Sequence, residues 1–224
     1  MIKKMENEDI YSHQRHSMVK EQIERRGVRD ARVLEAMRQV PRHIFVPADM
    51  YSMAYDDCPM PIGHGQTISQ PYIVGLMTSL LRLQGHENVL EVGTGSGYQA
   101  AILGLLASSV HSLERIPELA EHAREVIISL NLKNIEIHVC DGSPGWTDAA
   151  PYHGILVTAA APRVPDPLLQ QLADGGRLVI PVGPRLSQDL EVWTRQGAAF
   201  DHEYVIPVAF VPLRGECGWQ QDDW

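Results

Sequence analysis

A run of glycines is the part of the sequence best suited to holding a ligand. Residues 89–92 read as a buried strand, residues 93–97 read Gly-Thr-Gly-Ser-Gly, and Tyr98 opens a helix-like segment. Glycine lets the backbone turn sharply and approach a ligand closely, and open α/β sheets bind ligands at the carboxyl ends of their strands. We therefore expect a cofactor pocket formed by Glu91, Gly93, Gly95 and Gly97. A tight strand-to-helix turn without a ligand is the alternative.

The spacing of the glycines bears on the identity of the cofactor. A dinucleotide fingerprint reads GxGxxG, and Tyr98 stands where its third glycine would be, which disfavours a nicotinamide or flavin dinucleotide. The pattern Glu-x-Gly-x-Gly-x-Gly instead resembles the first motif of the class I S-adenosylmethionine-dependent methyltransferases. This resemblance implies S-adenosyl-L-methionine as cofactor, contacting the loop through its amino-acid portion.

Two acidic positions agree with this resemblance. Glu114 ends the next predicted strand, where a carboxylate can accept hydrogen bonds from both ribose hydroxyls. Asp141 and Gly142 follow the third predicted strand, where the superfamily places a carboxylate near the adenine amino group. Plainer interpretations are a solvated strand end for Glu114 and a simple turn for Asp-Gly. We expect Glu114, Asp141 and Gly142 to bind the cofactor.

The segment before the glycine run bears on the methyl acceptor. Residues 63–71 read Gly-His-Gly-Gln-Thr-Ile-Ser-Gln-Pro, and further distinctive runs lie at 42–47, 157–162, 176–183 and 210–213. Together they closely resemble the protein-L-isoaspartate O-methyltransferases, over about residues 18–213.

The resemblance implies a protein-repair enzyme. Its acceptor is the free α-carboxylate of an L-isoaspartyl residue, which forms when Asn deamidates or Asp isomerises through a succinimide. The methyl ester is a better leaving group than the carboxylate, so the succinimide re-forms and can reopen to normal aspartate. A main-chain carboxylate ordinarily has a pKa of about 3.3–3.7 and is ionised at neutral pH, so no general base is required. Positioning and exclusion of water should dominate instead.

The resemblance assigns the catalytic role to Ser69. Its hydroxyl would hydrogen-bond the isoaspartyl carboxylate and hold one oxygen in line with the methyl group. It would not act as a nucleophile, because no His-Asp relay is evident around it. Ser69 could instead cap the helix that begins at residues 70–71. The other residues expected on the substrate side are His64, Thr67, Ile68 and Val211. Two alternatives stay open here: local hydrogen bonds could hold His64, and residues 210–213 could be only a buried closing strand.

Alternating strands and helices must position these residues. Helices are predicted at 17–26, 30–40, 71–81, 98–107, 117–130 and 167–172, and strands at 88–92, 110–114, 135–140, 155–158, 177–182, 190–195 and 204–210, with a long loop over 45–70. Strands separated by helices indicate βαβ units. The expected fold class is α/β: a doubly wound, mostly parallel Rossmann-like methyltransferase sheet with helices on both faces and an antiparallel strand near the C-terminus.

The chain of 224 residues suits one domain. We expect a single methyltransferase domain over 17–213, divided into helices and substrate loop (17–71) and a cofactor-binding core (72–213). A flexible lead-in over 1–16 and a tail over 214–224 would flank it. Neither flank has a counterpart in the resemblance.

Composition narrows the partners. Nineteen Lys and Arg against 28 Asp and Glu leave a net charge of −9 without a basic run, which disfavours nucleic acid. Three separated cysteines indicate a reducing compartment. The start lacks a signal-peptide apolar core and no apolar run is long enough for a membrane span, so we expect a cytoplasmic protein. The scattered histidines predict no metal site. We expect a monomer that acts on isoaspartyl proteins and peptides.

Three other functions are compatible with parts of the sequence. A related methyltransferase could modify a carboxylate in one dedicated peptide, although no extra peptide-recognition domain is evident. A non-catalytic S-adenosylmethionine-binding protein is another alternative, and the intact set Ser69, Gly93, Gly95 and Glu114 argues against it. A dehydrogenase would require nicotinamide binding and a proton-handling residue, which the glycine spacing does not support.

Overall fold

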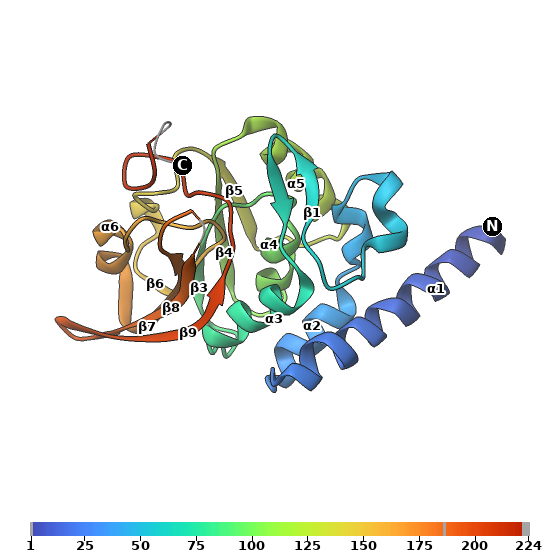
Figure 1. Cartoon of the computed structure of the whole chain (residues 1–224), viewed down its shortest axis with the longest axis horizontal. Coiled ribbons are helices and arrows are strands. Elements are labelled where there is room, and N and C mark those ends of the chain that lie inside the picture. The colour runs from blue at the N-terminus through green and yellow to red at the C-terminus, as the bar shows by residue number, and fades with distance from the viewer. Residues whose placement is uncertain (1, 186, 221–224) are drawn as a thin grey trace.

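The computed structural model describes residues 2–185 and 187–220, with side chains from residue 10 onward, and is built around a seven-stranded sheet (Figure 1). The strand order is β5-β4-β3-β6-β7-β8-β9. The strands are β3 (Asn88–Val92), β4 (Ser109–Glu114), β5 (Ile135–Val139), β6 (Tyr152–Val157), β7 (Leu172–Val182), β8 (Gln188–Gln196) and β9 (Ala199–Val208). The first five strands in this order, from β5 through β4, β3 and β6 to β7, run parallel. The predicted α/β fold class is confirmed.

The carboxyl-terminal strands close the sheet as a meander. β8 pairs antiparallel with β7, and β9 pairs antiparallel with β8. The connections at 183–187 and 197–198 are too short for a crossover, which a parallel neighbour would need. The predicted hairpin-like finish is therefore confirmed.

Helices lie on both faces of the sheet. They are α2 (Ala31–Gln39), α3 (Pro71–Leu80), α4 (Tyr98–Gly104), α5 (Pro117–Ser129) and α6 (Asp166–Gln170). The Asp30 carboxylate caps α2 by accepting the amides of Arg32 and Val33 at 2.9 and 3.3 Å, as its type predicts. None of the helices within the described residues is long and apolar enough to cross a membrane.

Alternation along the strands divides the core into two clusters. Val89, Leu156 and Val179 join one cluster with residues of α2, α3, α4 and α5. Their neighbours Leu90, Ile155 and Leu178 join the other cluster, which includes Leu168 of α6. Successive strand side chains point to opposite faces, so a strand buried on both sides is apolar throughout.

A helix occupies most of the segment over residues 1–16 that was expected to be a flexible lead-in. It forms α1 (Ile2–Met18), which continues into a π-helical turn (Val19–Ile23) and a 3₁₀ turn (Glu24–Arg26). Tyr11 stacks on His43 with ring centroids 4.1 Å apart, and Arg15 donates to the Arg38 carbonyl and to the Tyr55 hydroxyl. These partners are distant in sequence, so the polar pattern of the segment does not indicate the contacts.

The predicted loop at 45–70 also contains short elements. 3₁₀ turns occur at Arg42–Phe45 and Ala48–Met53, and another lies later in the chain at Thr147–Ala149. A small hairpin pairs β1 (Met60–Gly63) with β2 (Gln66–Ile68). This hairpin places the segment ending at Ser69 beside the carboxyl ends of the central strands.

Candidate active site

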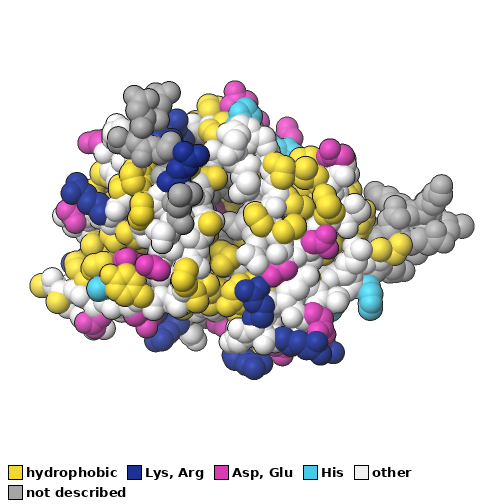
Figure 2. Space-filling model, in the orientation of Figure 1, with side chains coloured by type: hydrophobic (Ala, Val, Ile, Leu, Met, Phe, Trp, Pro, Cys, Tyr) yellow, Lys and Arg dark blue, Asp and Glu magenta, His cyan; other side chains and the backbone are white. Residues whose placement is uncertain are grey.

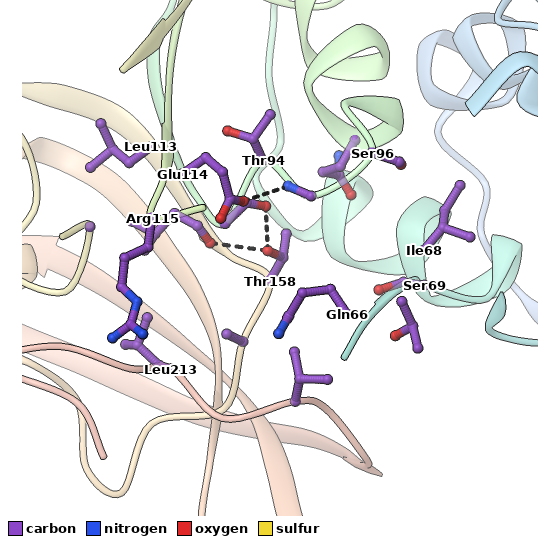
Figure 3. Close-up of a pocket in the computed structure, with 18 of the residues that line it drawn as sticks. Gln66, Ile68, Ser69, Thr94, Ser96, Leu113, Glu114, Arg115, Thr158 and Leu213 are labelled. Atoms are coloured by element: carbon purple, nitrogen blue, oxygen red, sulfur yellow. Dashed lines mark hydrogen bonds between the residues drawn. The ribbon is translucent and has the colours of Figure 1, made fainter. Parts of the chain in front are cut away.

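A cavity opens at the carboxyl ends of β3, β4 and β6. It is lined by residues 66–69, 74, 77, 92–96, 98–99, 113–116, 142, 158–159 and 211–214. Figure 3 shows Glu114 and Arg115 on one side of this cavity, Ile68 and Ser69 on the other, and Thr158 between them. Open α/β sheets bind ligands at the carboxyl ends of the strands, at the point where the strand order reverses. In this sheet that point lies between β3 and β6, beside the cavity. The sequence prediction of a pocket at this edge is confirmed.

The glycine loop is pinned by a threonine that the sequence prediction did not include. Gly93 has a φ of +99°, and a Cβ placed on it would lie 2.2 Å from Thr158 Oγ1. That hydroxyl donates to the carbonyls of Gly93 and Val92 at 2.6 and 3.1 Å. Thr158 follows β6, the strand beside β3, and this position at the shared sheet edge is the signal that could have identified it.

The other two glycines of the loop have different tasks. Gly95 lines the cavity and donates its amide to Glu114 Oε2 at 2.8 Å. Gly97 precedes α4 and does not line the cavity. A Cβ on Gly97 would lie 3.0 Å from the Ala123 Cβ, so this glycine serves the close packing of α5 against the loop.

Glu114 lies in the cavity wall. Its two carboxylate oxygens accept the amides of Gly95 and Ile116 at 2.8 and 2.9 Å, and the residue is only 7% exposed. An ionised carboxylate has about four acceptor positions, so two remain for a ligand. A vicinal diol presents two donors that suit this arrangement.

Glu91 lies behind the loop and does not line the cavity. It accepts a hydrogen bond from the Ser112 hydroxyl, which in turn pairs with the Thr94 hydroxyl. Burial raises the pKa of Glu91 to about 8; the Ser112 hydrogen bond opposes this shift, and the nearby Glu114 charge adds to it. A neutral Glu91 therefore supports the loop from below, where direct cofactor contact was expected.

Asp141 is likewise placed differently from the expectation, whereas Gly142 lines the cavity. The Asp141 carboxylate accepts the amides of Ser143 and Glu216 at 2.9 and 2.7 Å. A Cβ on Gly215 would lie 2.0 Å from this carboxylate. Asp141 therefore holds the segment after Leu213, and Leu213 and Arg214 line the cavity in its place.

A second cavity adjoins the first. The two share Thr67, Ser69, Thr158 and Val211 as lining residues. The second cavity is otherwise bordered by Arg26, Pro59, residues 70, 72 and 73 of the α3 start, and residues 206–210. Ser69 therefore lies at the junction, where a group held in one cavity faces a group held in the other.

The Ser69 hydroxyl does not cap the following helix. Gln70 is the N-cap residue of α3, and that cap has no side-chain hydrogen bond. Within the described part of the chain, no residue forms a hydrogen bond with this hydroxyl. The capping alternative is therefore wrong, and the hydroxyl is available at the cavity junction.

A buried arginine fixes the Ser69 backbone. Arg42 donates to the carbonyls of Ser69 and Ala54, both at 2.8 Å, and its guanidinium lies 4.9 Å from the Tyr98 ring centroid. Burial lowers the pKa of Arg42, yet an arginine keeps its charge in proteins. Sequence patterns alone cannot distinguish a buried arginine from a surface one, so this residue was missed.

The remaining substrate-side residues divide into two groups. Thr67, Ile68 and Val211 line the cavities, and their contact with substrate stays a prediction. His64 is exposed at the β1–β2 turn with a φ of +52° and lines neither cavity. Gln66, from the same hairpin, lines the cofactor-side cavity instead.

Comparison with known proteins supports one assignment. Residues 13–218 match the family model described as protein-L-isoaspartate(D-aspartate) O-methyltransferase, so the match extends beyond residue 213 into the tail. The chain is 54% identical over 206 residues to protein-L-isoaspartate O-methyltransferase 1 of Syntrophobacter fumaroxidans, covering 92% of this chain and 96% of that protein. It is 52% identical to the Methanoculleus marisnigri enzyme over 212 residues, covering 95% and 96%.

Solved structures agree with the sequence relatives. A protein-L-isoaspartate O-methyltransferase superposes with a TM-score of 0.81 at 26% identity, covering 92% of this chain and 67% of the other. A putative Plasmodium falciparum protein-L-isoaspartate O-methyltransferase, solved with S-adenosyl-L-homocysteine, superposes with a TM-score of 0.77 at 26% identity, covering 89% and 98%. The chain belongs to the protein-L-isoaspartate O-methyltransferase family.

Proposed function

We propose that this chain transfers a methyl group from S-adenosyl-L-methionine to the free α-carboxylate of L-isoaspartyl residues in damaged proteins and peptides. The observation that carries this proposal is the position of Ser69, at the junction of two cavities with its hydroxyl uncommitted. The Plasmodium relative binds the demethylated cofactor, which supports the same cofactor here.

The residues of the first cavity suit this cofactor. A Cβ at Gly93 would clash with Thr158, so the loop forms a cradle that only glycine permits, and the open acceptor positions of Glu114 suit a ribose diol. Residues 93–96 and Glu114 would hold the cofactor, with Gly142, Leu213 and Arg214 along the wall. When bound, S-adenosyl-L-methionine supplies an electrophilic methyl group on a sulfonium.

The protein's contribution to the reaction is placement. Ser69 donates its hydroxyl hydrogen to the substrate carboxylate and holds one oxygen toward the first cavity. Arg42 fixes the Ser69 carbonyl and therefore the backbone from which that hydroxyl projects. The acceptor is already ionised, so no side chain has to remove a proton. Glu91, the carboxyl with a raised pKa, is buried outside the cavity and is not a general base.

A labelling experiment tests the reaction. The chain is incubated with methyl-labelled S-adenosyl-L-methionine and matched peptides that contain Asp, L-isoAsp or D-Asp at one position. We expect base-labile label in the L-isoAsp peptide. Equal labelling of the Asp peptide would contradict repair. Labelling of one sequence only, among several isoaspartyl peptides, would favour the dedicated-substrate alternative, and binding without labelling would favour a non-catalytic protein.

We also propose that the protein acts as a cytoplasmic monomer on protein substrates. Cys58, Cys140 and Cys217 are free thiols, as a reducing compartment allows. On the face drawn in Figure 2, Lys and Arg side chains lie among Asp and Glu and form no continuous basic surface in the coloured residues. Sedimentation analysis tests the monomer, and a dimer at micromolar concentration would contradict it.

A further inference from the structure

Two histidines and a glutamate gather on one face of β4 and β5. His111 pairs with Glu136 in the strand register, and Leu113 pairs with His138. Partners in a register share a face, and so do residues two apart on a strand, so the three side chains point to the same side. His111 Nδ1 lies 3.3 Å from His138 Nε2, and Glu136 Oε2 lies 3.9 and 4.0 Å from these two nitrogens.

These distances approach those of a metal centre. Zinc binds imidazole nitrogens at about 2.0–2.1 Å, which places two nitrogens of a tetrahedral site about 3.4 Å apart. The histidine pair already meets this spacing. The Glu136 carboxylate needs a shift of about half an ångström to match, and its side chain is 70% exposed, which leaves it room to move. The histidine side chains are 15% and 21% exposed, so they are held in place.

Aromatic neighbours set the orientation of both imidazoles. His138 stacks on Trp146 with ring centroids 4.3 Å apart at 22°, and the Tyr152 ring stands edge-on to His111 at 6.3 Å. Rings held by packing lose less freedom on binding an ion than mobile surface histidines do. The cluster is therefore partly preorganised.

Local charge also favours a cation. The charged groups that act on His138 include the carboxylates of Glu136 and Asp148 and the guanidinium of Arg124. That guanidinium is engaged elsewhere, with Glu121 at 3.2 Å and with the Ile137 carbonyl at 2.8 Å. Two carboxylates against one committed arginine leave a negative environment around the histidine pair.

We propose that His111, Glu136 and His138 bind one divalent transition-metal ion of the zinc or nickel class, which joins β4 to β5 and leaves a coordination position for water. The site lies apart from the methyl-transfer cavities, so its success or failure is independent of the proposed reaction. The spacing of histidines along the sequence predicts no metal site; the strand pairing is what brings these residues together. Without a metal, the same pair would simply share one N–H···N hydrogen bond.

Calorimetric titration of the full, untagged chain with nickel chloride tests the site, after chelator treatment and at neutral pH. Nickel is used because imidazole suits it, whereas zinc also binds thiolates and the chain has free cysteines. We expect one ion per chain and a higher melting temperature with metal. His111→Asn and His138→Asn should each weaken binding at least tenfold, and Glu136→Gln by a smaller factor.

A matched control and a second readout keep the test decisive. His86 and His153 form another ring pair, with centroids 6.1 Å apart, and neither is one of the three proposed ligands, so His86→Asn should leave the affinity unchanged. If a cluster variant does not fold, crystals of the wild-type chain soaked in zinc should show an anomalous peak between the three side chains. The proposal is overturned by a peak elsewhere only, by unchanged affinity in a folded His138→Asn variant, or by no binding at about 1 mM metal.

Discussion

At the scale of single residues, chemistry depends on groups whose hydrogen-bonding capacity is left open. Ser69 has an uncommitted hydroxyl, and Glu114 has two remaining acceptor positions. Glu91, by contrast, is enclosed and serves the loop above it through Ser112. Two carboxyls of the same region therefore have separate roles, because one faces the cavity and the other is desolvated beneath it.

Replacing Ser69 with alanine should lower kcat without weakening the binding of the cofactor. A hydrogen bond to a charged group contributes about 1.5–3 kcal/mol, which corresponds to a loss of about 10- to 150-fold in kcat. The affinity for S-adenosyl-L-homocysteine should change less than about twofold. Steady-state kinetics with an isoaspartyl peptide measures the first quantity and calorimetry the second. Ser79→Ala, which removes a helix hydroxyl bonded to the Leu76 carbonyl, should retain full kcat.

Replacing Glu91 with glutamine should remove a pH-dependent loss of stability. The folded pKa is raised to about 8, so Glu91 stabilises the fold best below its unfolded pKa of about 4.3, and this contribution is lost progressively as pH rises toward 8. Between pH 5 and pH 8, the free energy of unfolding of the wild type should therefore fall by about 2–5 kcal/mol relative to that of Glu91→Gln. Urea unfolding at several pH values measures the difference. A constant difference across this range would contradict the raised pKa.

At the scale of elements, the loop between β3 and α4 has little room for substitution at Gly93. Gly93→Ala places a methyl group on Thr158 and forces a side chain into a positive φ. We expect binding of S-adenosyl-L-homocysteine to fall at least tenfold and the free energy of unfolding to fall by about 1–3 kcal/mol. Gly197→Ala is the control, because Gly197 also has positive φ (+62°) but no atom within 4 Å of its Cβ position. Equal losses in both variants would show that backbone strain alone is responsible.

The segment after Leu213 is an element that completes the cofactor cavity. Asp141→Ala removes the acceptor of the Ser143 and Glu216 amides, and we expect the KM for S-adenosyl-L-methionine to rise several-fold with little change in kcat, because Leu213 and Arg214 lose their anchor. Asp174→Ala removes a similar carboxylate, which accepts the Gly197 amide at 2.7 Å in a remote turn, and should leave this KM unchanged. A large kcat loss without a change in KM would contradict the anchoring role.

At the scale of the whole molecule, ligand binding should stabilise the entire domain. The cofactor cavity is lined by residues from the hairpin, three central strands and the C-terminal segment, so the site exists only in the folded chain. S-adenosyl-L-homocysteine at 100 times its Kd should raise the free energy of unfolding by about 2.7 kcal/mol, observed as a melting temperature about 5–10 °C higher. Ser69→Ala should keep this shift, and Gly93→Ala should lose about half of it or more at the same ligand concentration. Equal shifts in the two variants would mean that the ligand binds elsewhere.

Local patterns in the sequence predict the order of the elements and the edge of the sheet at which the site lies. Asp30, Pro71 and the glycine run mark element boundaries through short-range chemistry, so helices, strands and the cofactor loop were predictable from local pattern. Family motifs added Ser69 and Glu114, which the structure brings to one cavity.

Contacts between side chains that are distant in sequence could not be predicted in this way. Glu91 is turned beneath its loop, Asp141 is occupied by the tail, and His111 lies beside His138 across two strands. The polar start of the chain forms a helix whose residue Tyr11 stacks on the distant His43. The physical reason is common to all four cases: each depends on contacts between segments separated by many residues, and local propensity carries no information about which segments will pack together.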